Sequence, residues 1–341
     1  MLVLKNKNYY NYLIYTYDKI YLTIKFRGAE LMRQKQKKID RRNNYMILAE
    51  NFFDENNKEK ALKFLEKALE FEGEKYETID ILFNIAILYD ELGQKEKAIE
   101  TYNKILEMNP NEAGAYYGIA IIYDENGEKD IALENYYKAI ELDPEYDRAY
   151  FYIANIYDEM GDKEKAIEFY KKVIELVPDD YIAYNNLGSI YEEIKEYDKA
   201  YEMINESIRI EGAYYKSLFN MGVVLKHLGK IEEAIKYYRL SIEVYNKYPY
   251  AYLNLSAIYI EEKKFNSAIK ILTEGIEKNP DAGFLYYNRA CCYINLGDVD
   301  TAIDDLIKAK KLYPEFNYML RTDKDLEVIR NNEKYSFLLD D

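Results

Sequence analysis

The apolar residues of this chain recur at intervals of three and four positions, a spacing that places them on one face of an α-helix. One such run contains Ala149, Tyr150, Ile153, Ala154, Ile156 and Tyr157. A second apolar run follows almost immediately after each first run. The pattern therefore predicts pairs of adjacent helices, in which the first helix has about four turns.

The breaks between paired helices carry residues that accept unusual backbone angles. Glycine, which adopts left-handed backbone freely, stands at five of these breaks, and a lysine replaces it at Lys195 and Lys263. The five glycines are Gly93, Gly127, Gly161, Gly229 and Gly297. Second helices end at sequences such as Leu142-Asp143-Pro144, because proline cannot continue the helical hydrogen-bond ladder.

The helix pairs repeat with a period of 34 residues. Prolines keep this register at Pro110, Pro144, Pro178, Pro280 and Pro314. Alanines keep it at Ala98, Ala132, Ala166, Ala200, Ala234, Ala268 and Ala302, and Ala61 precedes Ala98 by 37 residues. A second column of small residues comprises Ala49, Ala86, Ala120, Ala154, Gly188, Gly222, Ser256 and Ala290. We expect these small residues to let helices approach closely while bulky neighbours fill the gaps.

These columns of small, aromatic, glycine, alanine and proline positions resemble the tetratricopeptide repeat. The resemblance implies an all-α, right-handed α-solenoid of about eight helix-turn-helix repeats. The predicted units are residues 42–78, 79–112, 113–146, 147–180, 181–214, 215–248, 249–282 and 283–316. Residues 317–341 resemble the capping segment that closes such arrays and shields the last apolar face from water.

The N-terminal segment differs from the rest in composition. Residues 1–41 carry 10 basic and 3 acidic side chains, whereas residues 42–341 carry 37 basic and 59 acidic ones. The codons of Arg27-Gly28-Ala29 can contain a bacterial ribosome-binding sequence at a suitable distance from Met32. We therefore predict that residues 1–31 are a non-native N-terminal extension or a disordered segment, and that residues 32–41 are a basic lead-in. The alternative is a genuine basic, aromatic N-terminal helix or membrane-surface anchor.

The composition of the chain limits which partners and which cellular compartment we expect. The formal net charge of −15 argues against a nucleic-acid partner, because phosphate backbones attract basic surfaces. No apolar run approaches the roughly 20 residues of a membrane span, and no signal-peptide core is evident. The two cysteines, Cys291 and Cys292, form no disulfide framework. We expect a cytoplasmic protein without membrane insertion.

The residues of enzymatic chemistry are scarce. His227 is the only histidine. The sequence therefore offers too few imidazoles for a histidine metal site, and we expect no histidine-based catalytic triad. Cys291 and Cys292 occupy neighbouring helical positions that point roughly 100° apart, which favours packing over metal chelation. Glycine-rich phosphate loops are absent from the sequence. We predict no catalytic residues, metal or cofactor.

The family resemblance implies that first helices line a concave groove, with their sixth position turned toward a bound peptide. From the second unit to the eighth, that position holds Asn84, Asn186, Asn220, Asn254 and Asn288, with Gly118 and Tyr152 in the third and fourth units. A carboxamide offers both a donor and an acceptor, the pair needed to hold a peptide unit. Asparagine is also simply common at this position in the family, so this reading stays open.

Aromatic residues stand at the fifth position of several first helices. They are Phe83, Tyr117, Phe151, Phe219 and Tyr287. An extended peptide could cover these rings with its side chains, although the rings could also be shared with packing between helices.

Paired acids end the first helices of the second to fifth units. They are Asp90, Glu91, Asp124, Glu125, Asp158, Glu159, Glu192 and Glu193. Carboxylates at a helix C-terminus oppose the helix dipole, so a basic ligand is one explanation. The other is a set of solvated charges that keep the array soluble. Acidic chaperone tails are disfavoured, because their clamp needs basic residues at the fifth and sixth positions.

The sequence as a whole favours an adaptor that binds another polypeptide, basic or extended, in its groove. The alternative is a self-assembling structural scaffold or a regulatory subunit of an enzyme complex that uses its outer face. An oligomer is compatible with either reading. RNA binding has little support, because a basic aromatic surface occurs only in the N-terminal segment.

Overall fold

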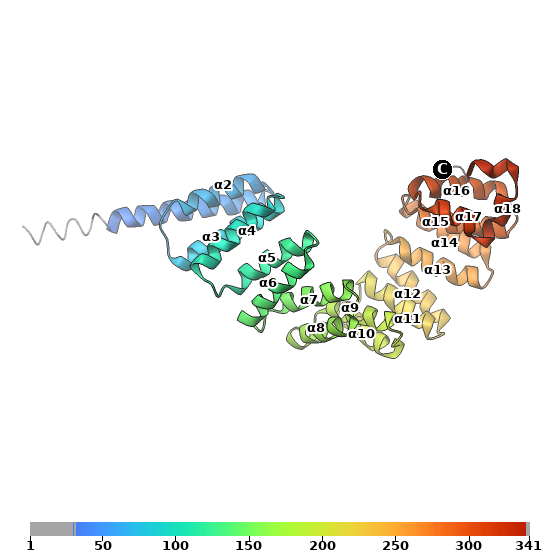
Figure 1. Ribbon diagram of the computed structural model, residues 1–341, viewed down its shortest axis with the longest axis horizontal. Coiled ribbons are helices and arrows are strands. Elements are labelled where there is room, and N and C mark those ends of the chain that lie inside the picture. Colours follow the sequence, from blue (N-terminus) through green and yellow to red (C-terminus); the bar gives the residue numbers. More distant parts are fainter. Residues whose placement is uncertain (1–29, 31, 339–341) are drawn as a thin grey trace, which may run out of the picture. The chain divides into compact units, whose positions relative to one another are not determined.

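The computed structural model describes residues 30 and 32–338, and these are all-α (Figure 1). The predictions about residues 1–31 therefore lie almost wholly outside the described residues. The chain divides into two compact units, one up to Ala149 and one from Tyr150 onward.

The unit up to Ala149 consists of helix pairs that pack side by side. Its first described helix covers residues 32–54. The helices that follow are α2 (Lys58–Leu69), α3 (Lys75–Glu91), α4 (Lys95–Met108), α5 (Ala113–Glu125) and α6 (Lys129–Leu142). In each repeat the first helix packs on the second, as α3 packs on α4 and α5 on α6.

The unit from Tyr150 onward continues the same alternation, and α7 (Asp147–Glu159) spans the boundary between the units. Its paired helices are α8 (Lys163–Leu176), α9 (Tyr181–Glu193), α10 (Tyr197–Ile210), α11 (Tyr215–His227), α12 (Ile231–Val244), α13 (Pro249–Glu261), α14 (Phe265–Lys278), α15 (Gly283–Asn295) and α16 (Val299–Leu312). Short segments then close the chain: α17 (Phe316–Thr322), η1 (Lys324–Leu326), α18 (Glu327–Arg330) and η2 (Glu333–Leu338). The predicted all-α architecture of successive helix pairs is confirmed.

Left-handed backbone separates the two helices of each repeat, as the glycine positions predicted. Gly93 has φ +71°, and the N–H of Gln94 bonds back to the carbonyl of Tyr89 at 2.8 Å. Lys195 and Lys263 adopt the same geometry, with φ of 65° and 57°, despite the cost of about 1 kcal/mol to a residue with a Cβ. The turn geometry is thus kept where its preferred residue is missing.

The columns of small residues lie at the contact between helices. Ala86, Ala120 and Ala154 are fully buried. A Cβ added at Gly222 would lie 2.7 Å from ring atoms of Tyr238, on the second helix of the same repeat. Close helix approach therefore depends on these small side chains.

The C-terminal segment packs on the last repeat. Leu320, Leu326 and Ile329 are buried in one cluster with Ala302 and Leu306 of α16. The guanidinium of Arg330 in α18 donates to the carbonyl of Leu320 at 3.2 Å, which ties the segment together.

The first described helix begins before residue 42, the expected start of the first repeat. The predicted lead-in, residues 32–41, forms its first turns. Arg42 is buried and donates to Glu77 at 3.1 Å and to Thr78 at 3.2 Å on α3. Its guanidinium occupies the space that a side chain at Gly73 would fill.

Gly222→Ala should destabilise the protein, because the new methyl group would collide with Tyr238. We expect a loss of about 1 to 3 kcal/mol in a urea unfolding experiment. Gly212→Ala, in the turn between α10 and α11, is the control for an added methyl group without a collision, since its Cβ would meet only the carbonyl oxygen of Ile208 at 3.7 Å. Alanine favours helix by about 1 kcal/mol over glycine, so a Gly222→Ala variant that is stabilised by about that amount would contradict the packing account.

Candidate functional site

The predicted asparagine column divides into two groups, and the first is held only by its own helices. The side-chain amide groups of Asn84, Asn254 and Asn288 each donate to the carbonyl four residues earlier, at 3.0, 3.0 and 2.7 Å. This bond uses one N–H of each amide. The second N–H and the carbonyl oxygen keep their capacity to bind a peptide unit.

The second group, Asn186 and Asn220, belongs to a hydrogen-bond network inside the unit from Tyr150 onward. Asn186 donates to the hydroxyl of Tyr170 at 3.1 Å, and that hydroxyl donates to Asn155. Asn185 donates to the amide oxygen of Asn186 at 3.2 Å. Asn220 in turn donates to the amide oxygen of Asn185 at 3.0 Å. These two members of the column therefore stabilise the contact between repeats.

Asn185 is the centre of this network, and sequence reasoning missed it. Its side chain is buried, with 3% of its surface exposed, and its oxygen also accepts from Ser217 at 3.1 Å. Ser217 contacts Ser207 at 2.6 Å, and Ser207 donates to the carbonyl of Tyr181 at 2.7 Å. A signal was available, because Asn185 stands at the fifth position, where the other units carry aromatic or aliphatic residues.

The fifth-position aromatics are shared with packing. Each ring lies against a tyrosine on the second helix of its own repeat. The pairs are Phe83 with Tyr102, Tyr117 with Tyr136, Phe151 with Tyr170 and Phe219 with Tyr238, at centroid distances of 5.7 to 6.0 Å. These four first-helix rings are only half-buried, so part of each remains accessible.

Tyr287 has a different environment from the other fifth-position aromatics. It is 5% exposed, stacks on Phe316 at 5.2 Å and donates its hydroxyl hydrogen to Asp323. Burial, followed by the Asp323 hydrogen bond, raises the pKa of Tyr287. The C-terminal segment thus covers the surface that this ring was expected to offer to a ligand.

The second acid of several pairs joins an ion pair between neighbouring repeats. Glu91 pairs with Lys58 at 3.2 Å and Glu125 with Lys95 at 2.9 Å. In the other unit Glu193 pairs with Lys163 at 2.5 Å. Each lysine begins a second helix and each glutamate ends the following first helix, so both oppose their own helix dipole. The pairing offsets both unfavourable placements.

The first acids of the pairs have varied partners. Asp158 also pairs with Lys163, at 2.6 Å, and Glu192 lies 3.1 Å from His227. Asp90 differs, because its buried Oδ1 has no hydrogen-bond partner among the described residues. Burial, and then the charge of Glu125, raises the pKa of Asp90, while Lys95 acts against this shift.

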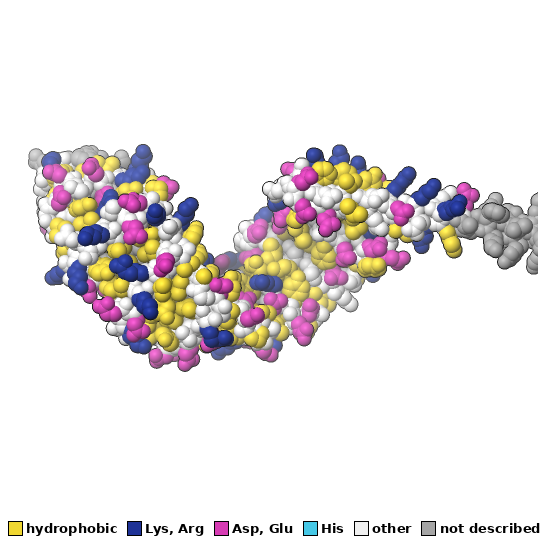
Figure 2. Space-filling view, turned by 180° about the vertical axis from the view of Figure 1, so that it is seen from behind, with side chains coloured by type: hydrophobic (Ala, Val, Ile, Leu, Met, Phe, Trp, Pro, Cys, Tyr) yellow, Lys and Arg dark blue, Asp and Glu magenta, His cyan; other side chains and the backbone are white. Residues whose placement is uncertain are grey.

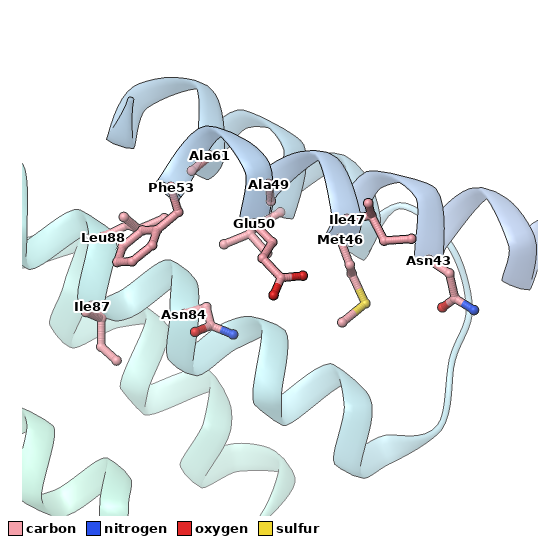
Figure 3. A pocket seen from close by; sticks show the side chains of 11 residues that line it. Asn43, Met46, Ile47, Ala49, Glu50, Phe53, Ala61, Asn84, Ile87 and Leu88 are labelled. Atoms are coloured by element: carbon pink, nitrogen blue, oxygen red, sulfur yellow. The ribbon is translucent and has the colours of Figure 1, made fainter. Parts of the chain in front are cut away.

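A hollow between the helix of residues 32–54 and α3 was not predicted (Figure 3). Its volume is about 590 Å³. It is lined by Asn43, Met46, Ile47, Ala49, Glu50, Phe53, Ala61, Leu65, Asn84, Ile87 and Leu88. We call it the N-terminal pocket. Asn84 of the predicted column lies in it, beside first-helix residues of the preceding repeat.

The N-terminal pocket exposes large apolar side chains. Ile47 is 55%, Phe53 51% and Ile87 44% exposed. In Figure 3 the carboxylate of Glu50 extends into the space between the two helices, and it is the only charged group in the lining. Sequence reasoning missed this pocket because the asparagine column begins only at the second unit. At the equivalent sixth position the first unit carries Ile47.

A smaller polar hollow lies in the unit from Tyr150 onward. Its volume is about 180 Å³ and its lining residues are Asn155, Asp158, Glu159, Tyr170, Asn186 and Ser189. The asparagine network therefore borders it, and the acids of α7 stand at its side.

Other chemistry is sparse in the described part of the chain. No group of three or more histidine, cysteine or acidic residues there could hold a metal ion. Burial raises the pKa of both Cys291 and Cys292 to about 12, so their thiols stay protonated near neutral pH. Within the same residues, no helix combines the length and apolar character needed to cross a membrane.

Comparison with protein families agrees with this geometry. Models described as tetratricopeptide repeat match residues 40–111, 113–146, 147–180, 169–202, 215–248, 249–281 and 271–304. The chain belongs to the tetratricopeptide repeat family.

Two curated relatives of this tetratricopeptide-repeat protein are Photosystem I assembly proteins named Ycf3. The one from a Synechococcus species is 46% identical over 52 residues, 15% of this chain and 30% of the relative. The one from Prochlorococcus marinus is 36% identical over 70 residues, 20% of this chain and 40% of the relative. The matches thus span less than half of either relative.

A solved structure of the APC/C hetero-tetramer Cut9-Hcn1 is similar over 86% of this chain and 54% of that chain. The TM-score is 0.54 and the sequence identity 19%, so the likeness shows the fold alone.

Asn220→Ala should destabilise this tetratricopeptide-repeat protein, because it leaves the buried oxygen of Asn185 with fewer donors. We expect a loss of about 1 to 2 kcal/mol in urea unfolding. Asn254→Ala is the matched control and should change the unfolding free energy by no more than about 0.5 kcal/mol. Equal losses for the two variants would contradict the division of the column into two groups.

Asp90→Asn should stabilise the protein near neutral pH. Because the folded-state pKa of Asp90 is raised, the stability tied to its protonated form is lost as pH rises through that pKa. The asparagine variant avoids this loss, so its advantage should be present at pH 7 and shrink in acid. Thermal unfolding across pH measures it, with Glu91→Gln, which loses the Lys58 pair, as the control. An advantage that grows toward low pH would contradict the assignment.

Proposed function

We propose that this chain is an interaction scaffold that holds a polypeptide segment of a partner protein against its first helices. Tetratricopeptide-repeat proteins serve as protein-interaction scaffolds. The peptide site is our addition to that general role, and the proposal includes no catalytic step. We place this function in the cytoplasm, consistent with the free thiols of Cys291 and Cys292.

The observation that carries the proposal is the N-terminal pocket. Contiguous exposed apolar surface marks an interaction site more often than scattered apolar residues do. Here Ile47, Phe53 and Ile87 line one hollow of about 590 Å³, within the range of ligand-binding clefts. Asn84 brings a free amide oxygen to the same hollow.

The unit from Tyr150 onward adds weaker support. Asn254 and Asn288 each keep one amide N–H and the amide oxygen for a ligand, and the half-buried ring of Phe219 offers an apolar surface. An extended segment could use the amides for its backbone and the ring for a side chain.

A basic ligand is the preferred class. Residues 42–341 carry 37 basic and 59 acidic side chains, so the surface favours encounters with cationic segments. On the face shown in the space-filling view, acidic and basic side chains are interspersed, with apolar groups between them (Figure 2). Asp90 strengthens the preference, since a carboxylate kept in an unfavourable environment is typical of functional positions. The ion pairs of Glu91, Glu125 and Glu193 weaken it.

A second candidate uses the other side of the repeats, as a self-assembling scaffold or a regulatory subunit would. A hollow of about 400 Å³ between α8, α9 and α10 favours it. The lining residues are Lys171, Ile174, Tyr184, Leu187, Tyr191, Lys199, Glu202 and Met203. The Ycf3 relatives are named for an assembly role, which is compatible with either candidate.

Selection from a displayed library of random peptides tests the proposal. We expect peptides that bind the full chain and lose at least about tenfold in affinity with Ile87→Asp, which places a charge in the apolar lining. Tyr184→Asp, in the hollow of α8 to α10, is the matched control and should leave their binding unchanged. Peptides lost with Tyr184→Asp and kept with Ile87→Asp would move the site to the second candidate.

A further inference from the structure

We propose that the N-terminal pocket binds an amphipathic α-helix of a partner protein, one that carries a lysine or arginine beside its apolar face. This inference rests on the proposed function, because it names the class of ligand that the same pocket takes.

The lining has the periodicity of a helix-docking surface. The lining residues of the helix 32–54 follow one another by three, one, two, one and three positions. They are Asn43, Met46, Ile47, Ala49, Glu50 and Phe53. They form a single stripe of about 15 Å along the helix, at 1.5 Å per residue. A partner helix with apolar side chains at positions i, i+3, i+4 and i+7 can contact a stripe of that length.

The second wall of the pocket shows the same kind of spacing. It comes from α3, where Asn84, Ile87 and Leu88 again follow helical spacing. Ala61 and Leu65 of α2 form the buried floor between the walls. Two helices with an apolar floor make a trough into which the apolar stripe of a third helix can pack.

A helical ligand suits this lining better than an extended one. An extended segment has a free N–H and C=O at every residue, and each needs a partner when it is buried. Apart from Glu50, the polar side chains in the lining are those of Asn43 and Asn84. A helix forms its backbone hydrogen bonds internally. It can therefore place apolar side chains against Met46, Ile47 and Ile87 without burying unpaired backbone groups.

The charge of the ligand follows from Glu50. Its side chain is exposed, it forms no ion pair among the described residues, and the lining contains no cation. A neutral apolar helix would bury part of this carboxylate without compensation, which is unfavourable. A lysine or arginine next to the apolar face of the ligand would pair with Glu50 while its stem stays in apolar contact.

Two designed helical peptides of about 18 residues provide the probe. Both carry leucines at i, i+3, i+4 and i+7, and they differ only in having lysine or glutamate beside that face. Fluorescence anisotropy with the full chain should show the lysine peptide bound about three- to tenfold more tightly than the glutamate peptide. Ile87→Asp should weaken both peptides.

Charge variants at Glu50 separate pairing from general acidity. Glu50→Gln should bring the two peptides to nearly equal affinity, and Glu50→Lys should reverse their order. Asp54→Asn is the matched control, because Asp54 is an exposed acid on the same helix and outside the lining. It should leave the preference intact. Equal effects of the two neutralising variants would overturn the proposed contact with Glu50.

The remaining outcomes are also decisive. Failure of both helical peptides, while library-selected peptides still depend on Ile87, would overturn the helix proposal and leave the proposed function standing. A dimer in sedimentation that Ile87→Asp dissociates would assign the pocket to a second copy of the chain. A monomer in which Ile87→Asp makes residues 1–29 sensitive to protease would assign the pocket to that segment.

Discussion

Close approach of the two helices in each repeat is the constraint on which the rest of the structure depends. It requires small residues such as Ala86 and Gly222 at the contact, where Tyr238 lies directly against the glycine. The turn with left-handed backbone at Gly93 brings the second helix back at the required angle.

Polar residues at equivalent positions of the repeats have different roles. Some hold neighbouring repeats together, and others keep hydrogen-bonding groups unused. The buried network around Asn185 uses Asn186 and Asn220, while Asn254 bonds only to its own helix and keeps one amide N–H and its amide oxygen. Ion pairs such as Lys95 with Glu125 likewise turn two unfavourable helix-end charges into a contact between repeats. The site is therefore smaller than the column of similar residues suggests. The proposed site centres on the N-terminal pocket, where Ile47, Phe53 and Ile87 expose large apolar surfaces.

The fold was predictable because one period of 34 residues repeats the same local signals many times. The site was less predictable, because residues at equivalent positions meet different neighbours. Tyr287 matches Phe219 in register, yet the C-terminal segment buries it. Arg42 directly follows the basic residues of the lead-in, yet its side chain is buried against α3. The pairing of Lys95 with Glu125 could have been found from their spacing, which recurs at Lys163 and Glu193.

The central claim is that the first helices hold a polypeptide segment. Hydrogen–deuterium exchange of the full chain, with and without a library-selected peptide, tests it most directly. We predict protection concentrated in residues 43–53 and 84–88, the two walls of the N-terminal pocket. Protection confined to α8 and α10, with both pocket walls unchanged, would contradict the account.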